Sequence, residues 1–434
     1  MIGKIFRQFG RKSRTKIPKL RKGISGFTLI ELLIALVMAS IIVTTLLTFL
    51  VSVLDTDRKE QAKAESQEEI QSALNFIADD LQQAVYIYDA DGLYLTGPSG
   101  PQGSRIVDQI PSGPNQTPVL VFWKRSQYQL TDQVTTSGGL TKFVGCLEFP
   151  DNAALCGSPP KGGDKFVFSL VAYYLIKDTD STWSNSARIA RWEIKDGIRW
   201  ACTDGRSPTD TPASVCPATD YNLRTDVPTT GVGFNVDPNR YVVSPDPNFI
   251  RFDVSGSGTL SDRMNRWRIS NGGSSNALTV LLDYVDDTPY TAAQDGAGVS
   301  PIKIGLVPNT PASGSTIPVT TPSTNFDCDR ADTGVGVGLT DADVSNLAVQ
   351  KVFSQRIPPD FSNATYNPIA TKPSSFYACV NAKQAVARVY IRGNALARLE
   401  KNANFRTVTD DKRASFVPTA SIRAFARGAL GIDQ

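Results

Sequence analysis

The stretch that decides the fold is Gly26-Phe27-Thr28-Leu29-Ile30-Glu31, which opens an apolar run from Phe27 to Leu54. The run has 28 residues, a single charge at Glu31, and no internal Pro or Gly. As a helix it would be about 42 Å long, and a bilayer core is about 30 Å thick. The sequence therefore predicts a membrane-spanning helix over residues 27–54.

A basic leader precedes this run. Residues 1–26 contain nine of the 45 Lys and Arg residues and none of the 42 Asp and Glu residues. The whole chain has a formal net charge of +3, but the remainder, with 36 bases against 42 acids, carries −6. Because positive flanks stay in the cytoplasm, we expect residues 1–26 inside and the bulk outside. The acidic bulk also argues against a nucleic-acid partner.

Two ordinary explanations of the run are weaker. A secretory signal peptide has a shorter apolar region, of about 7–15 residues, and its small residues follow that region. Here Gly26 precedes the run. A plain signal anchor explains everything except Glu31, because an acid inside a membrane helix costs about 2.5–3.5 kcal/mol on insertion scales. Glu31 is therefore a candidate functional residue.

The segment Gly26–Glu31 closely resembles the cleavage and methylation motif of type IV prepilins and type II secretion pseudopilins. The resemblance implies that prepilin peptidase cuts after Gly26 and that the new amine of Phe27 is N-methylated. It also implies that Glu31 pairs with the terminal amine of a neighbouring subunit during assembly, since opposite charges in a low dielectric are less costly together than apart. The partners implied are prepilin peptidase, the inner membrane and other pilins or pseudopilins.

The sequence predicts that the helix continues over residues 55–85, because helix formers dominate there and Pro and Gly are absent. One apolar stripe with spacings of three and four residues predicts a face that packs on a head domain. An independent coiled coil is disfavoured, because the stripe lasts barely two heptads. The stripe consists of Ile70, Leu74, Ile77, Leu81 and Val85.

The head, residues 86–434, reads as short strands between loops rich in Gly, Pro and Ser. The stretch from Phe166 to Leu175 and the stretch from Ala187 to Ile194 predict an antiparallel hairpin. Three loop-rich stretches are expected to be insertions that decorate one sheet: 97–117, 202–247 and 286–338. The strand candidates are Val119–Lys124, Lys165–Lys177, Ala187–Lys195, Phe249–Val254, Ala277–Tyr284 and Val386–Arg392. The expected fold class is α+β and pilin-like, with a long N-terminal helix packed on an antiparallel sheet.

Narrower resemblances concern the subfamily. The hairpin and the stem end Leu81–Val85 resemble those of the J-type minor pseudopilins. The K-type tip pseudopilin lacks the acid that this chain has at Glu31, so Glu31 argues against that branch. The segments Leu81–Leu93 and Val389–Arg398 resemble pseudopilins of the cyanobacterial hormogonium polysaccharide secretion system. This group implies polysaccharide export during gliding, with polysaccharide as a further partner. A mature chain of 408 residues is too large for a major pilin, so a minor subunit is expected.

Six cysteines lie in the predicted exported part, where disulfides are permitted. Adjacent pairing is the simplest arrangement, although six cysteines allow fifteen pairings and buried free thiols stay an alternative. The candidate pairs are Cys146–Cys156, Cys202–Cys216 and Cys328–Cys379.

Catalytic, metal and cofactor sites are not predicted. The chain has no His and no CxxC motif, which excludes His-based catalysis and disfavours zinc. The acid-rich loops Asp283–Asp287 and Asp327–Asp332 suit calcium by chemistry but match no EF-hand, so turn residues explain them better. The run Gly334–Gly338 lacks a phosphate-binding spacing.

The sequence thus predicts a non-enzymatic minor pseudopilin that primes or caps a filament. The alternative is a tip adhesin that binds polysaccharide or a surface. The weakest hypothesis is an enzyme carried on a pilin stem. Paired carboxylates can serve a glycosidase, but a chain with 42 acids contains many such pairs by chance. The tryptophans suit core packing better than sugar stacking; they are Trp123, Trp183, Trp192, Trp200 and Trp267.

Overall fold

The structure is a computed structural model of the full chain, and it divides into two compact units, residues 1–57 and 58–434. Each unit is described by itself. The residues that the structure describes are 27–94, 105–136, 140–147, 159–160, 162–199, 241–243, 246, 249–250, 252, 260–269, 276–288, 355–359, 361, 363–399 and 416–428.

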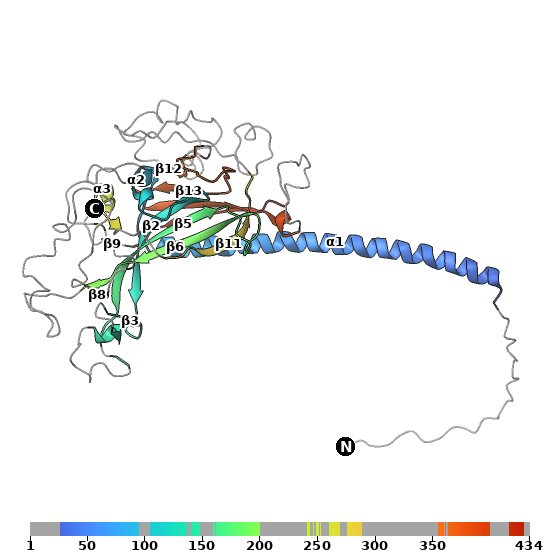
Figure 1. The fold of residues 1–434 in the computed structure, drawn as a ribbon, viewed down its shortest axis with the longest axis horizontal. Helices are drawn as coiled ribbons and strands as arrows, with labels where there is room; N and C mark the ends of the chain where they lie inside the picture. Colours follow the sequence, from blue (N-terminus) through green and yellow to red (C-terminus); the bar gives the residue numbers. More distant parts are fainter. Residues whose placement is uncertain are drawn as a thin grey trace, which may run out of the picture. The chain divides into compact units, whose positions relative to one another are not determined.

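Helix α1 (Leu29–Gln82, 54 residues) is the longest element (Figure 1). It contains no Pro or Gly, so nothing in its sequence interrupts it. It ends at Gln82, whereas the apolar stripe predicted a helix to Val85. Val85 lies instead in strand β1 (Ala84–Ile87), where it is also buried. The apolar stripe could not show where α1 ends and β1 begins, because the apolar residues of both elements are buried at this point.

A five-stranded antiparallel sheet forms the first layer of the head. Its order is β1-β2-β5-β6-β11, so the long strands lie at its centre. The predicted hairpin is confirmed as β5 (Lys165–Ile176) paired with β6 (Ala187–Lys195). The other two strands are β2 (Gln116–Tyr128), longer than predicted, and β11 (Thr279–Val285).

A second sheet of four antiparallel strands corrects the expectation of one decorated sheet. Its order is β12-β13-β14-β15, and only β14 was predicted. Its strands β12 and β13 pack against β2 of the first sheet. The four strands are β12 (Gln355–Ile357), β13 (Phe376–Asn381), β14 (Val386–Arg392) and β15 (Thr419–Phe425).

Short elements complete the described part. Within the predicted strand at residues 249–254, β9 is described and pairs with β10, whereas residues 251, 253 and 254 lie outside the described residues. The remaining strands are β3 (Gln133–Thr135), β4 (Thr141–Phe143), β7 (Ile198–Arg199), β8 (Tyr241–Val243), β9 (Phe249–Ile250) and β10 (Arg268–Ile269). The short helices are α2 (Ala90–Tyr94), α3 (Leu260–Met264) and the 3₁₀ turns η1 (Ile106–Asp108), η2 (Val144–Cys146) and η6 (Ala395–Arg398).

One hydrophobic core joins α1 to both sheets. The predicted stripe of α1 lies in it, with Ile70, Leu74, Ile77 and Leu81 all 2% exposed or less. The inner faces of β5 and β14 contribute to the same cluster. At about 25 cal/mol per Å², burial of this apolar surface is the main force that holds the C-terminal part of α1 on the head.

Candidate functional site

The first turn of α1 is a capping box built from Thr28 and Glu31. The backbone N and the Oγ1 of Thr28 each donate to Oε2 of Glu31 at 3.1 Å. In return, the backbone N of Glu31 donates to the Thr28 hydroxyl at 3.3 Å. The carboxylate therefore lies at the positive end of the helix dipole, which stabilises its charge at the start of an apolar segment.

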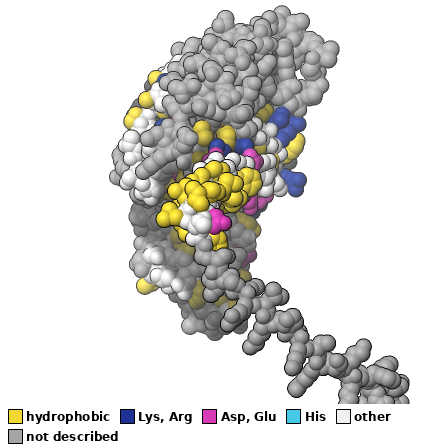
Figure 2. All heavy atoms as spheres, turned by 90° about the vertical axis from the view of Figure 1, so that its right-hand side faces the viewer, with side chains coloured by type: hydrophobic (Ala, Val, Ile, Leu, Met, Phe, Trp, Pro, Cys, Tyr) yellow, Lys and Arg dark blue, Asp and Glu magenta, His cyan; other side chains and the backbone are white. Residues whose placement is uncertain are grey.

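The apolar side chains that follow are exposed. Phe27 is 85% exposed, and Figure 2, which faces this end of α1, shows apolar side chains grouped there. By length and composition, α1 is the one helix in the described part of the chain that could cross a membrane, and its most apolar window is not buried against protein. The apolar helix and its motif indicate membrane anchoring. The predicted cleavage residue, Gly26, lies outside the described residues.

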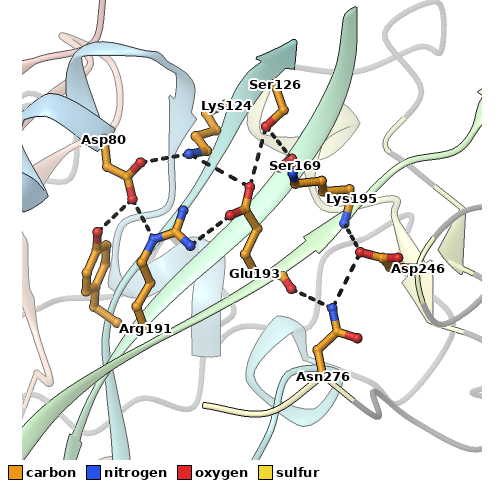
Figure 3. Close-up of polar contacts among 10 residues, drawn as sticks. Asp80, Lys124, Ser126, Ser169, Arg191, Glu193, Lys195, Asp246 and Asn276 are labelled. Atoms are coloured by element: carbon orange, nitrogen blue, oxygen red, sulfur yellow. Dashed lines mark hydrogen bonds and ion pairs between the residues drawn. The ribbon is translucent and has the colours of Figure 1, made fainter. Parts of the chain in front are cut away.

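The other end of α1 carries a buried charge, Asp80, that contacts three neighbouring strands (Figure 3). Its Oδ1 accepts a hydrogen bond from Lys124 Nζ of β2 at 2.7 Å. Its Oδ2 accepts from the hydroxyl of Tyr173 on β5 at 2.6 Å and from Nε of Arg191 on β6 at 2.7 Å. One carboxylate thus binds β2, β5 and β6 to the helix.

Glu193 closes these contacts into a ring of alternating charges. It lies two residues after Arg191 on β6 and therefore on the same face of the sheet. Its Oε2 is 2.7 Å from Nη1 of Arg191, and its Oε1 is 3.8 Å from Nζ of Lys124. We call Asp80, Lys124, Arg191 and Glu193 the charge ring (Figure 3). The sheet supplies two cations and one anion, so the helix supplies the charge that makes the ring neutral.

The contacts of Asp80 determine its protonation state and that of Tyr173. Burial raises the pKa of Asp80, but the hydrogen bonds and charges of Arg191 and Lys124 outweigh burial and hold the pKa below its ordinary value of 3.8. Burial and the Asp80 carboxylate raise the pKa of Tyr173. Such groups stay ionised or neutral throughout the neutral range, which suits structural contacts and not proton transfer.

The charge ring was not predicted from the sequence. Asp80 is one of 42 acids, and only its neighbours in space distinguish it from Asp79, which is exposed. A weak signal was present in β6, where Arg191 and Glu193 alternate with the apolar residues of a buried strand. Charges at two successive positions on one face of such a strand imply a charged partner.

Two of the six cysteine candidates lie in the described part of the chain. Cys379 is in a disulfide, and Cys146 is buried. The remaining four, Cys156, Cys202, Cys216 and Cys328, lie outside the described residues, so the proposed pairings stay predictions. The glycine run at residues 334–338 also lies outside them.

The first acid-rich loop uses its carboxylates within the protein. Asp283 accepts hydrogen bonds from the backbone N and the hydroxyl of Ser184. Asp286 binds Nε of Arg392 at 2.6 Å. Within the described ranges, no group of three or more His, Cys, Asp or Glu residues is arranged to hold a metal. The second loop, Asp327–Asp332, lies outside the described residues.

Three of the five tryptophans, Trp123, Trp192 and Trp267, are fully buried in the core. Trp183 differs, because it is 38% exposed in the loop between β5 and β6 and packs 6.0 Å from the guanidinium of Arg188. Trp200 lies outside the described residues.

Comparison with known proteins identifies the N-terminal segment. Residues 21–47 match the family model for the prokaryotic N-terminal methylation motif. No curated protein and no solved structure matches the chain. The motif implies processing by prepilin peptidase and assembly with other pilins. Together with the long apolar helix and the antiparallel sheets, it supports a type IV pilin- or pseudopilin-like protein.

Proposed function

We propose that this protein is a minor pseudopilin, a structural subunit that primes or caps a pilus-like or type II secretion-like filament. The observation that carries the proposal is the capped acid, Glu31, at the start of an exposed apolar helix within the methylation motif. In this account the leader stays in the cytoplasm, the stem spans the inner membrane, and the head lies outside until the subunit enters a filament.

The minor role is supported by the size of the head. Cleavage after Gly26 would leave a mature chain of 408 residues, most of them in the head, which is large for a subunit repeated along a whole filament. We further propose that the filament serves polysaccharide secretion and gliding motility. The proposal of polysaccharide secretion rests on the resemblance of the stem end and of the β14 region to pseudopilins of the hormogonium polysaccharide secretion system.

The role is structural and not catalytic in this proposal. The absence of His from the sequence removes the commonest general base. The buried charges described above are held in ion pairs that connect secondary-structure elements, as in the charge ring.

The test compares two acids of the same helix in the cell that makes the protein. We expect Glu31→Val to leave the protein in the membrane but to remove it from sheared filaments, because the terminal amine of a neighbour loses its partner. Glu68→Val changes an exposed acid elsewhere on α1 and should leave incorporation unchanged. Incorporation of Glu31→Val at the wild-type level contradicts the proposal.

A second candidate function is a tip module that binds polysaccharide, and the exposed Trp183 favours it. An aromatic ring on a hairpin loop can stack on a sugar ring. The full-length protein should then bind a glycan saturably, and Trp183→Ala should abolish that binding. Failure to bind any glycan on an array counts against this function.

A further inference from the structure

The stem end of α1 is held not only by the five-stranded sheet but also by the C-terminal part of the described chain. We define residues 393–399 and 416–428, which follow β14 and include β15, as the C-terminal clasp. The two pieces hydrogen bond to each other, because Gly393 N donates to Pro418 O at 2.8 Å and Ala395 N donates to Phe416 O at 2.9 Å. They therefore form one unit against the helix.

The clasp contacts the end of α1 through the backbone. Arg427 N donates to Gln82 O at 3.1 Å, which satisfies a carbonyl that the helix end leaves without an internal partner. Gly428 N donates to Ala84 O at 2.9 Å. A Cβ atom at Gly428 would lie 2.5 Å from Ala84 O, so only Gly permits this approach.

The clasp also contacts α1 three to five turns earlier. Arg398 forms an ion pair with Glu69 and lies 3.7 Å from Glu65. A Cβ atom at Gly393 would lie 2.6 Å from Cδ1 of Ile70, so the backbone passes directly over the helix there. Lys63 Nζ lies 4.5 Å from the ring centre of Phe416.

Chain order separates the clasp from the five-stranded sheet. All five strands of the first sheet, and every member of the charge ring, precede residue 286. If the head emerges from the membrane in chain order, it can therefore complete the first sheet and bury Asp80 before the clasp has emerged. The clasp, by contrast, spans the docked length of the stem from Lys63 to Ala84.

We propose that the C-terminal clasp is a strap that closes over α1 after the five-stranded sheet has formed and locks the stem to the head. The strap opens and closes without unfolding that sheet. Only a subunit whose chain has been exported through residue 428 then has a locked stem. Contiguous segments that open separately from the global unfolding transition are common in proteins.

Hydrogen exchange of the full-length protein in detergent tests the strap. Gly428→Ala should raise exchange about tenfold or more at residues 80–84 and 419–428, because two backbone hydrogen bonds are lost. Exchange in β5 should stay within about twofold of wild type. The matched control is Gly163→Ala, since a Cβ atom there would meet nothing within 4 Å.

A milder variant tests the strap even if Gly428→Ala fails to fold. Arg398→Gln keeps most of the side chain but removes its charge, and it should raise exchange at residues 63–70 by about threefold. Two results overturn the proposal. Unchanged exchange in α1 for both variants means that the clasp does not hold the stem. An equal rise in β5 for either variant means that the clasp is part of one cooperative core.

Discussion

Asp80 carries the charge that the sheet side of the charge ring lacks. Its removal leaves Lys124 and Arg191 buried with only Glu193 to compensate them. An uncompensated buried charge is much more costly than the net gain of the intact ion pair. At the scale of single residues, the head is therefore more sensitive to Asp80 than to any exposed acid of the stem.

We expect Asp80→Asn to lower the free energy of unfolding by about 3 kcal/mol at pH 7. Because the folded-state pKa of Asp80 is lowered, its stabilising effect is present above pH 3.8 and is lost as the pH falls below that value. The difference between wild type and variant should therefore shrink in acid. Denaturant unfolding at several pH values measures it.

The adjacent exposed acid is the control, and Asp79→Asn should change the stability by less than about 0.5 kcal/mol. A second-site change separates charge from packing. Lys124→Met should restore part of the stability of Asp80→Asn, because it removes an excess cation. Additive destabilisation by the two changes contradicts the charge argument.

Asp89 behaves in the opposite way. Burial, helped by the charge of Asp91, raises its pKa to about 7. A raised folded-state pKa means that its contribution is greatest below pH 3.8 and is lost as the pH rises toward 7. Asp89→Asn should therefore raise the thermal midpoint at pH 8 by about 4 °C or more, while the Asn side chain still accepts from Gly92 N.

The measurement for Asp89 is a thermal melt at pH 8 and at pH 4. The gain should be lost at pH 4, where the wild-type carboxyl is already neutral. An equal gain at both pH values means that the cost at Asp89 is steric or conformational and not electrostatic.

At the scale of elements, the apolar stripe decides how α1 packs on the head. Leu74 is fully buried, and Leu74→Ala should lower the free energy of unfolding by about 2–5 kcal/mol. Gln71→Ala, on the exposed face of the same helix, should have little effect. Chemical denaturation of both variants checks the pair, and equal losses contradict the assigned face.

Elements with strong periodicity could be predicted from the sequence. The stem helix has an apolar run without Pro or Gly, followed by a stripe with spacings of three and four residues. The β5–β6 hairpin has two runs rich in apolar, β-branched and aromatic residues on either side of a polar loop. Strands β12 and β15 could not be predicted, because β12 has only three residues and both strands acquire their pairing from partners elsewhere in the chain. The second sheet is therefore a product of tertiary contacts.

The candidate site divides in the same way. Glu31 could be identified as a candidate functional residue from the sequence, because an acid inside an apolar membrane helix is costly. The charge ring and the clasp could not, because their members are ordinary residues until the fold brings them together. In the clasp, Gly393 matters because its backbone lies against Ile70 of α1, and Gly428 matters because its backbone lies against Ala84 of β1.

At the scale of the whole molecule, the proposed cleavage would change the net charge of the protein. Removal of residues 1–26 would convert a chain of net charge +3 into an acidic exported subunit of net charge −6. In the proposed function, the nine bases of the leader would serve orientation and peptidase recognition. The stem, locked by the charge ring and the clasp, would connect the head to the filament.

Mass spectrometry of the N-terminus of the assembled protein tests the central claim most directly. The account predicts a mature chain of 408 residues that begins with N-methylated Phe27. A chain in assembled material that still begins at Met1, or that begins within the head, contradicts it.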